Sequence, residues 1–115
     1  MRDRIRSFGY AFRGILTLVG GAATARIHLA ATIAVIALGM ASGLQTGEWT
    51  AIILAISTVW SAEAMNTAVE RLADRTAPEH HPLVRAAKDV AAAGGLIASL
   101  GALAVGLAVF LPRIA

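Results

Sequence analysis

The sequence has no cysteine, and only 15% of its 115 residues are charged. The lack of cysteine excludes a disulfide scaffold, a thiolate metal site and a cysteine nucleophile. Soluble globular domains carry about 25% charged residues. The deficit of charge, together with a mean hydropathy of +0.71, therefore indicates a membrane protein rather than a soluble packed core. The length suits one small domain, and no internal repeat or linker divides it.

Three apolar segments are long enough to cross a bilayer, where a helix needs about 20 residues. They run over 27–44, 49–69 and 90–111, and they predict an all-α membrane protein with one domain over 1–115. The first segment contains one titratable residue, His28, the second contains Glu63, and the third has no charged residue. All three are rich in small residues, which let membrane helices approach closely.

Residues 1–21 are expected to form an amphipathic surface helix in the plane of the lipid headgroups. Large apolar residues recur there at helical spacing, with arginines on the other sides: Ile5, Phe8, Phe12, Ile15 and Leu16. The basic start and the "ATA" ending also fit a secretory signal peptide. Gly20 and Gly21, however, cut the apolar run short of a usual signal core.

Lysine and arginine are absent from the loop "SGLQTGE" between the first two segments, but they are frequent at the opposite end. The N-terminal arm holds five arginines, and Arg71, Arg75, Arg85 and Lys88 follow the second segment. The positive-inside rule then predicts a cytoplasmic N-terminus and 71–89 loop, with the C-terminus outside. We therefore expect a multi-pass protein of a bacterial inner membrane, whose basic residues are anchors rather than contacts to nucleic acid.

The stretch "SAEAMNTAVERLAD" carries four polar side chains at the end of the second apolar segment. On a helix, Glu63, Glu70 and Asp74 fall within about 40° of one another, and Asn66 lies about 60° to one side. An acid within a span costs on the order of 2.5–3.5 kcal/mol, so Glu63 indicates a functional site. Alternatively, these residues mark the cytoplasmic end of the helix, which explains Glu70 and Asp74 well but Glu63 poorly.

The loop "DRTAPEHHPLVRAAKD" follows, and its two prolines interrupt the helix. The second, Pro82, suits the start of a new helix, because its φ is fixed and it has no N–H to leave unpaired. Lys88 and Asp89 would then lie about two turns into the third helix, where a lysine could meet a phosphate. The alternative is a solvated turn, and the pair His80 and His81 is a weak metal signal.

No segment matches the phosphate-binding loop G-x-x-x-x-G-K-[ST] or the dinucleotide fingerprint. Composition and spacing by themselves therefore indicate a three-span membrane protein with an acidic stripe on its cytoplasmic side. This arrangement is compatible with an enzyme, or with a small proton-coupled transporter that uses Glu63 as a relay.

The string E-x-x-N-[ST]-A-[VI]-E-x-x-x-D, present as "EAMNTAVERLAD", resembles the signature of the prokaryotic diacylglycerol kinase family, which includes undecaprenol kinases. The Lys-Asp pair of "EHHPLVRAAKD" follows at the family's usual spacing, and "FGYAFRG" and "ARIHLA" resemble its surface helix and first span. The resemblance covers nearly the whole chain. It implies a homotrimeric membrane lipid kinase with sites shared between subunits, which transfers the γ-phosphoryl group of Mg-ATP to a lipid hydroxyl.

The resemblance also implies roles for individual residues. Glu63 matches the general base, Asn66 and Asp74 match polar site residues, and Glu70 matches a ligand of Mg²⁺. The residues implied to contact ATP are Tyr10, Glu70, Glu79, His80, His81, Lys88 and Asp89. These residue types suit phosphoryl transfer, which needs positioning and charge neutralisation, and Mg²⁺, which prefers oxygen ligands.

One position departs from the family's pattern. A glutamate that helps to hold the metal usually stands four residues before the basic residue of "RIH", and this chain has Ala22 there. Asp74 or a neighbouring subunit could complete the metal site, catalysis could be weak, or the fold could persist without activity. We expect retained activity, because every other motif carboxylate is intact. "RIH" itself resembles the undecaprenol kinase branch, so undecaprenol is expected as the lipid, with diacylglycerol as the alternative.

Overall fold

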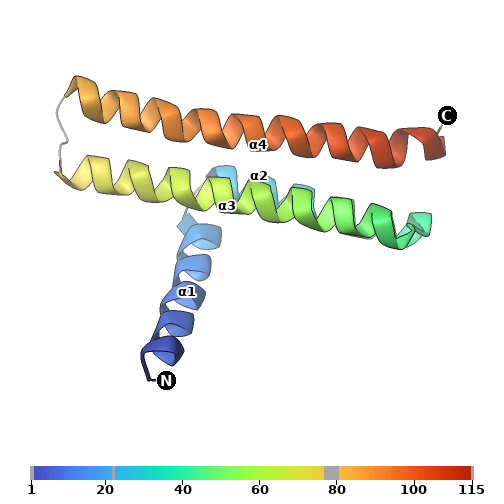
Figure 1. The fold of residues 1–115 in the computed structure, drawn as a ribbon, viewed down its shortest axis with the longest axis horizontal. Coiled ribbons are helices and arrows are strands. Elements are labelled where there is room, and N and C mark those ends of the chain that lie inside the picture. The colour runs from blue at the N-terminus through green and yellow to red at the C-terminus, as the bar shows by residue number, and fades with distance from the viewer. Residues whose placement is uncertain (1, 22, 77–80, 115) are drawn as a thin grey trace.

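The computed structural model describes residues 2–21, 23–76 and 81–114, and these form α-helices joined by short connections. The helices are α1 (Arg2–Gly21), α2 (Ala23–Ser42), α3 (Thr46–Thr76) and α4 (Pro82–Ile114). Figure 1 shows α3 and α4 side by side and antiparallel, with α2 on the far side of α3 and α1 projecting away from the bundle. The prediction of an all-α architecture is confirmed.

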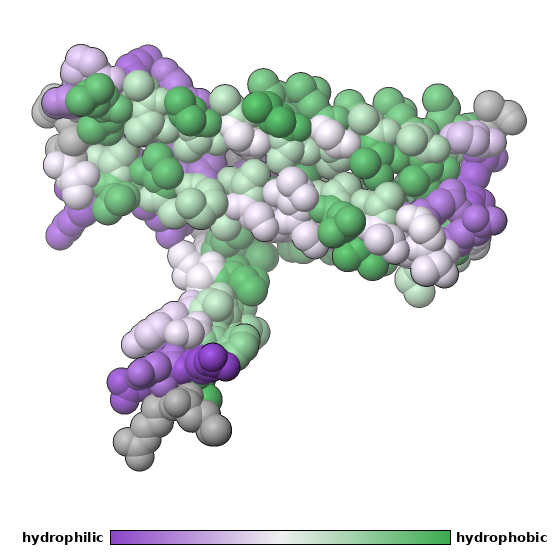
Figure 2. Space-filling model, in the orientation of Figure 1, coloured by the Kyte–Doolittle hydropathy of each residue, from purple (hydrophilic) through white to green (hydrophobic). Residues whose placement is uncertain are grey.

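Helices α2, α3 and α4 are each long and apolar enough to cross a membrane, as predicted for 27–44, 49–69 and 90–111. Figure 2 shows a predominantly apolar surface along the middle of the bundle and polar surface at both of its ends. Most of the large apolar side chains on these helices are exposed. Such a surface is unfavourable in water but is expected against lipid tails, which are as apolar as leucine.

The most extensive helix contact joins α3 and α4. The less exposed positions of α4 recur every three or four residues, and most are small: Ala91, Gly95, Ala98, Ala102, Val105 and Val109. Small side chains allow two membrane helices to approach closely. Near the C-terminal end of α4, Val109 and Phe110 are buried against Ile52 of α3 and form the small apolar core.

The turn between α2 and α3 depends on two glycines. Gly43 has a φ of 65°, a left-handed conformation that favours glycine, and it ends α2 at Ser42. The expected first segment, 27–44, therefore extends slightly beyond the helix. Gly39 is buried beneath the ring of Trp49, and a Cβ atom there would lie 2.8 Å from the ring atom Cη2. A glycine at this position lets α2 and α3 meet closely.

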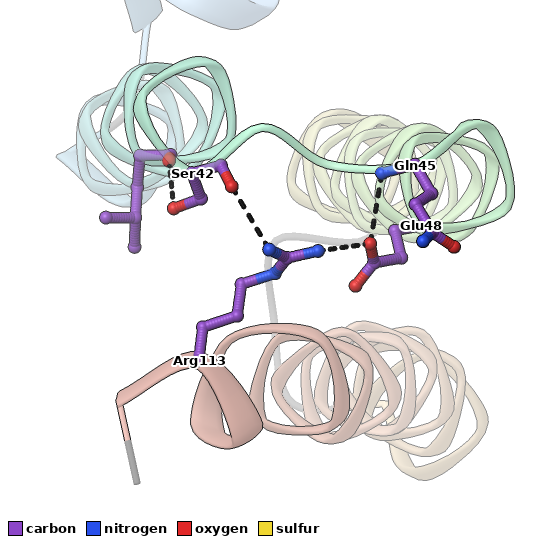
Figure 3. A network of polar contacts seen from close by, with 5 residues as sticks. Ser42, Gln45, Glu48 and Arg113 are labelled. Carbon is purple, nitrogen blue, oxygen red and sulfur yellow. Dashed lines mark hydrogen bonds and ion pairs between the residues drawn. The ribbon is translucent and has the colours of Figure 1, made fainter.

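Arg113 ties the end of α4 to the α2–α3 turn (Figure 3). Its Nη1 donates to the carbonyl of Ser42 at 3.1 Å, and its Nη2 pairs with the carboxylate of Glu48. The same carboxylate accepts a hydrogen bond from the backbone N–H of Gln45 at 3.0 Å, which caps the start of α3. We call Ser42, Gln45, Glu48 and Arg113 the closed end. Its contacts explain why α4 continues to Ile114 instead of ending at Pro112.

The expected N-terminal helix is present as α1, and it lies across the direction of the other helices (Figure 1). Leu18, near its C-terminal end, is buried, whereas Ile5, Phe8 and Phe12 are exposed. Because the α2–α3 turn is short and α2 has 20 residues against 31 in α3, α3 extends beyond α2 by on the order of 16 Å. This extension carries the second half of the acidic stripe. An amphipathic surface role for α1 stays a prediction.

Candidate functional site

Glu63 is the buried charged residue in the described ranges, with 7% of its surface exposed. It lies on α3, and its Oε2 is 3.5 Å from Nε2 of His28 on α2. A buried carboxylate is unfavourable unless a polar partner faces it, and acids within membrane spans usually mark functional sites. The burial of Glu63 therefore favours the functional interpretation over that of a solvated helix end.

An apolar groove of about 340 Å³ lies between α2, α3 and α4. Its α3 wall includes Ile52, Ile56 and Val59, and His28 of α2 also lines it. At 100° per residue, these three α3 residues and Glu63 fall within about 60° of one another. The groove and the acidic stripe therefore follow one face of α3, and His28 lies where they meet.

Asn66 and Glu70 occupy the next turns of α3 toward the connection with α4. The Nδ2 of Asn66 donates to Oε1 of Glu70 at 3.2 Å. The Oδ1 of Asn66 is buried and has no hydrogen-bond partner among the described residues. An unpaired buried carbonyl costs about 1–3 kcal/mol, so a ligand that reached this oxygen would remove that cost.

Asp74, near the end of α3, and Lys88, near the start of α4, connect the two helices. The Nζ of Lys88 lies 2.8 Å from Oδ1 of Asp74, and the two side chains are 39% and 68% exposed. An exposed ion pair of this kind contributes about 0–1 kcal/mol. Lys88 can therefore exchange Asp74 for another anion at little cost. We call Asn66, Glu70, Asp74 and Lys88 the site end.

The remaining predicted residues are placed less directly. His81 stands just before α4, where its Nδ1 accepts a hydrogen bond from the backbone N–H of Leu83 at 3.2 Å and so caps the helix. Asp89 is exposed beside Lys88. Tyr10 is exposed on α1, where the guanidinium of Arg13 lies 5.2 Å from its ring centroid. Three further positions lie outside the described residues: Ala22, Glu79 and His80.

The structure thus places six predicted residues between the middle and one end of the α3–α4 pair: Glu63, Asn66, Glu70, Asp74, Lys88 and Asp89. The first four form one row along α3, and Lys88 of α4 pairs with the last of them, Asp74, whereas Asp89 is exposed. Tyr10 is not drawn into this group, because the N-terminal part of α1 points away from the bundle (Figure 1).

A site built wholly from protein ligands for a metal is not found within residues 2–21, 23–76 and 81–114, which contain no cluster of three potential ligands. Mg²⁺ requires less from the protein when it arrives with a nucleotide, because one or two carboxylates and the phosphates then hold it. The carboxylate of Glu70 and the unpaired Oδ1 of Asn66 are oxygen ligands of this kind. The residues present therefore fit a nucleotide-borne Mg²⁺.

Sequence reasoning noted His28 as an isolated titratable residue but did not connect it with Glu63. It also missed Trp60, whose ring packs against the imidazole of His28, and Thr32, which accepts a hydrogen bond from Trp60. A usable signal was present, because polar residues inside membrane spans tend to pair with one another. His28 and Glu63 are the titratable residues of their predicted segments.

Comparison with known proteins finds matches over most of the chain. The profile of the family described as prokaryotic diacylglycerol kinase matches residues 9–110. The undecaprenol kinase of Bacillus subtilis is 37% identical over 109 residues, which cover 95% of this chain and 89% of that protein. The diacylglycerol kinase of Synechocystis sp. is 33% identical over 107 residues, 92% of this chain and 61% of that protein. The diacylglycerol kinase of Pseudomonas aeruginosa is 28% identical over 94 residues, 82% of this chain and 76% of that protein.

Proposed function

The chain belongs to the prokaryotic diacylglycerol kinase family and is a lipid kinase, and we propose that it transfers the γ-phosphoryl group of ATP to the hydroxyl of a membrane lipid. The reaction takes place at the cytoplasmic face of the bacterial inner membrane. The observation that carries the proposal is the continuity between the apolar groove and the acidic stripe along one face of α3.

This continuity matches the two parts of the substrate. A membrane lipid alcohol has an apolar tail and a hydroxyl at its end. The part of the tail next to the hydroxyl fits a groove walled by side chains such as Ile52, Ile56 and Val59, and the hydroxyl then reaches the level of Glu63. Neither part of the lipid would have to leave its preferred environment.

Glu63 is the general base in this proposal. Its carboxylate accepts the proton of the lipid hydroxyl as the lipid oxygen forms a bond to the γ-phosphorus. The bond between the γ-phosphorus and the β–γ bridging oxygen breaks, and ADP departs with that oxygen. General-base catalysis by one positioned group typically contributes about 10²–10⁴-fold in rate.

The site end holds the phosphates. Mg²⁺ neutralises phosphate charge, and Glu70 would hold it together with the Oδ1 of Asn66. Lys88 leaves its exposed pair with Asp74 and contacts the phosphates as a point charge. Asp74 and Asp89 border this position.

Other parts of the chain contact the nucleotide. Those positions are Tyr10, Glu79, His80 and His81, and they are proposed on the family's pattern. His81 also caps α4, so its nucleotide contact would use the ring edge that does not face Leu83. The position of Ala22 leaves one fewer carboxylate for the metal in this chain.

Undecaprenol is the lipid we favour, with diacylglycerol as the alternative. The relative named undecaprenol kinase is more similar to this chain, at 37% identity, than the two relatives named diacylglycerol kinase, at 33% and 28%. The "RIH" segment supports the same choice, and its histidine, His28, lines the groove that would receive the tail.

The proposed enzyme is oriented with its N-terminus and 71–89 loop in the cytoplasm and its C-terminus outside, as the arginine distribution supports. Helix α1 rests in the headgroup plane through its exposed Ile5, Phe8 and Phe12. The homotrimer, with sites shared between subunits, follows from the family's pattern.

The proposal is tested by phosphoryl transfer from labelled Mg-ATP in mixed micelles, with undecaprenol and diacylglycerol offered separately. We expect transfer to undecaprenol that is lost in Glu63→Gln and, at limiting Mg²⁺, in Glu70→Gln. Glu48→Gln is the matched control, because it removes an acid from the closed end of the same helix. Absence of transfer to both lipids by a folded protein would refute the proposal.

The same assay separates two alternatives. A non-catalytic family member, for which Ala22 is the argument, would bind Mg-ATP without turnover. A small proton-coupled transporter with Glu63 as relay would function without ATP and would respond to the membrane potential.

A further inference from the structure

Two polar contacts link α2 and α3, about one helical turn apart along the helices. In the first, Nε2 of His28 lies 3.5 Å from Oε2 of Glu63. In the second, Nε1 of Trp60 donates to Oγ1 of Thr32 at 3.0 Å. Polar contacts between apolar helices are selective, because an unpaired polar group in lipid is costly. The two contacts therefore fix which faces of α2 and α3 pack together near Glu63.

Trp60 of the second contact packs against the imidazole of His28, which belongs to the first. The rings of His28 and Trp60 meet edge to face, with centroids 6.2 Å apart and an interplanar angle of 63°. The hydroxyl of Thr32 also donates to the carbonyl of His28 at 2.7 Å. Trp60 thus packs against the His28 ring, and Thr32 joins Trp60 to the backbone of His28.

His28 touches both halves of the proposed substrate site. Its ring lines the apolar groove, and its Nε2 faces one carboxylate oxygen of Glu63, whose side chain is 9% exposed. The separation of 3.5 Å is longer than a good hydrogen bond, and catalytic hydrogen bonds are often long before substrate binds. A contact to Oε2 leaves Oε1 for the incoming hydroxyl.

We propose that His28 is a positioning residue for phosphoryl transfer, which orients the carboxylate of Glu63 by holding its Oε2 so that Oε1 meets the lipid hydroxyl at the end of the groove. This role rests on the proposed function. It adds to the proposed site a second side chain, on α2, that does not itself touch the phosphates.

The first test compares two replacements of similar bulk. His28→Leu fills the space without a donor, whereas His28→Gln keeps an N–H donor near Glu63. We expect His28→Leu to lower kcat by up to about 100-fold, the loss that a misplaced catalytic group can cause, with the KM for ATP unchanged. His28→Gln should recover most of that loss. Ser61→Ala, which changes an exposed residue of α3 that is not among the groove residues, is the control and should retain the wild-type kcat.

The outcomes are distinct. If the wild-type protein phosphorylates lipid and His28→Leu has the same kcat, the positioning role is wrong while the kinase assignment stands. If His28→Leu and His28→Gln lose kcat equally and both lower the thermal stability, His28 has a structural role instead. If the wild-type protein phosphorylates neither lipid, the proposed function fails and this role fails with it.

A second readout does not need activity. The chain has three histidines, so ¹⁵N-histidine labelling of the full-length protein in nanodiscs gives three sets of imidazole signals, and His28→Gln identifies the set of His28. We expect Glu63→Gln to shift the His28 set and to leave the other two in place. An unchanged His28 set would overturn the proposal whatever the kinetics show.

Discussion

The two ends of the α3–α4 pair differ in how fully their polar groups are hydrogen-bonded. At the closed end, Arg113 bonds both Ser42 and Glu48, and Glu48 also accepts from Gln45 (Figure 3). At the site end, Asn66 keeps a buried oxygen without a partner in the described part of the chain. Lys88 forms an exposed pair with Asp74. Satisfied polar groups hold helices together, whereas unsatisfied ones are available to a ligand.

The closed end therefore stabilises the helix bundle, and the site end is proposed to bind the substrates. The closed end connects residues that are far apart in the chain, such as Glu48 and Arg113, and it fixes the helix ends. The site end places carboxylates in a row above an apolar groove, where the proposed lipid and nucleotide meet. Substitutions at the two ends should therefore change different measurements.

The largest expected effect is on the metal requirement. Glu70→Gln removes the carboxylate proposed to hold Mg²⁺, and we expect the Mg²⁺ concentration for half-maximal activity to rise by about 10–100-fold, as losses at metal sites commonly do. Titration of Mg²⁺ at saturating ATP measures this shift. Glu48→Gln, the matched change at the closed end, should leave the Mg²⁺ dependence unchanged. Equal Mg²⁺ curves for Glu70→Gln and wild type would remove Glu70 from the metal site.

The next effect concerns packing near the closed end. Gly39→Ala places a Cβ against the Trp49 ring, and such overpacking typically costs about 1–3 kcal/mol. Gly94→Ala is the matched control, because nothing lies within 4 Å of its new Cβ, and it should be neutral or stabilising. Thermal unfolding in a fixed detergent measures both. A Gly39→Ala protein as stable as Gly94→Ala would show that α2 and α3 are not in close contact there.

A smaller loss of stability is expected from Arg113→Ala. It leaves the carboxylate of Glu48 and the carbonyl of Ser42 without their shared donor, so the apparent Tm should fall. The kcat at a temperature well below Tm should stay at the wild-type value, because the closed end lies outside the proposed site. A fall in kcat with an unchanged Tm would reverse the assignment of the two ends.

The smallest effect is predicted for Asp74→Asn. Its exposed pair with Lys88 contributes about 0–1 kcal/mol, so the Tm should hardly move. Activity should change more than stability, because Asp74 borders the proposed phosphate position. A Tm loss as large as that of Gly39→Ala would mean that the pair is structural.

Much of the fold could be predicted from the sequence. Hydropathy located the apolar helices, the prolines located the break before α4, and helical geometry put Glu63, Glu70 and Asp74 on one face. These features depend on the spacing of residues along the chain, which can be read from the sequence. The start of α4 at Pro82 is confirmed for the same reason.

The contacts between helices could not be predicted in this way. The pairs His28–Glu63 and Glu48–Arg113 join residues 35 and 65 positions apart, and spacing gives the depth of a residue but not its neighbour. The stop of α2 at Gly43 depended on a backbone φ that other glycines in the chain do not adopt. The roles of individual site residues stay predictions, and Ala22, Glu79 and His80 lie outside the part of the chain that the structure describes.

The central claim is that the lipid tail occupies the groove that leads to Glu63. Gly106 lines this groove, and a Cβ there meets no atom within 4 Å, so Gly106→Leu should fill the groove without disturbing the helix. Gly101→Leu is the matched control, since Gly101 is equally open but is not among the groove residues. The measurement is the KM for undecaprenol and for ATP in both variants. The account predicts that Gly106→Leu raises the KM for the lipid and leaves that for ATP unchanged, while Gly101→Leu matches wild type. Wild-type lipid kinetics in Gly106→Leu would contradict it.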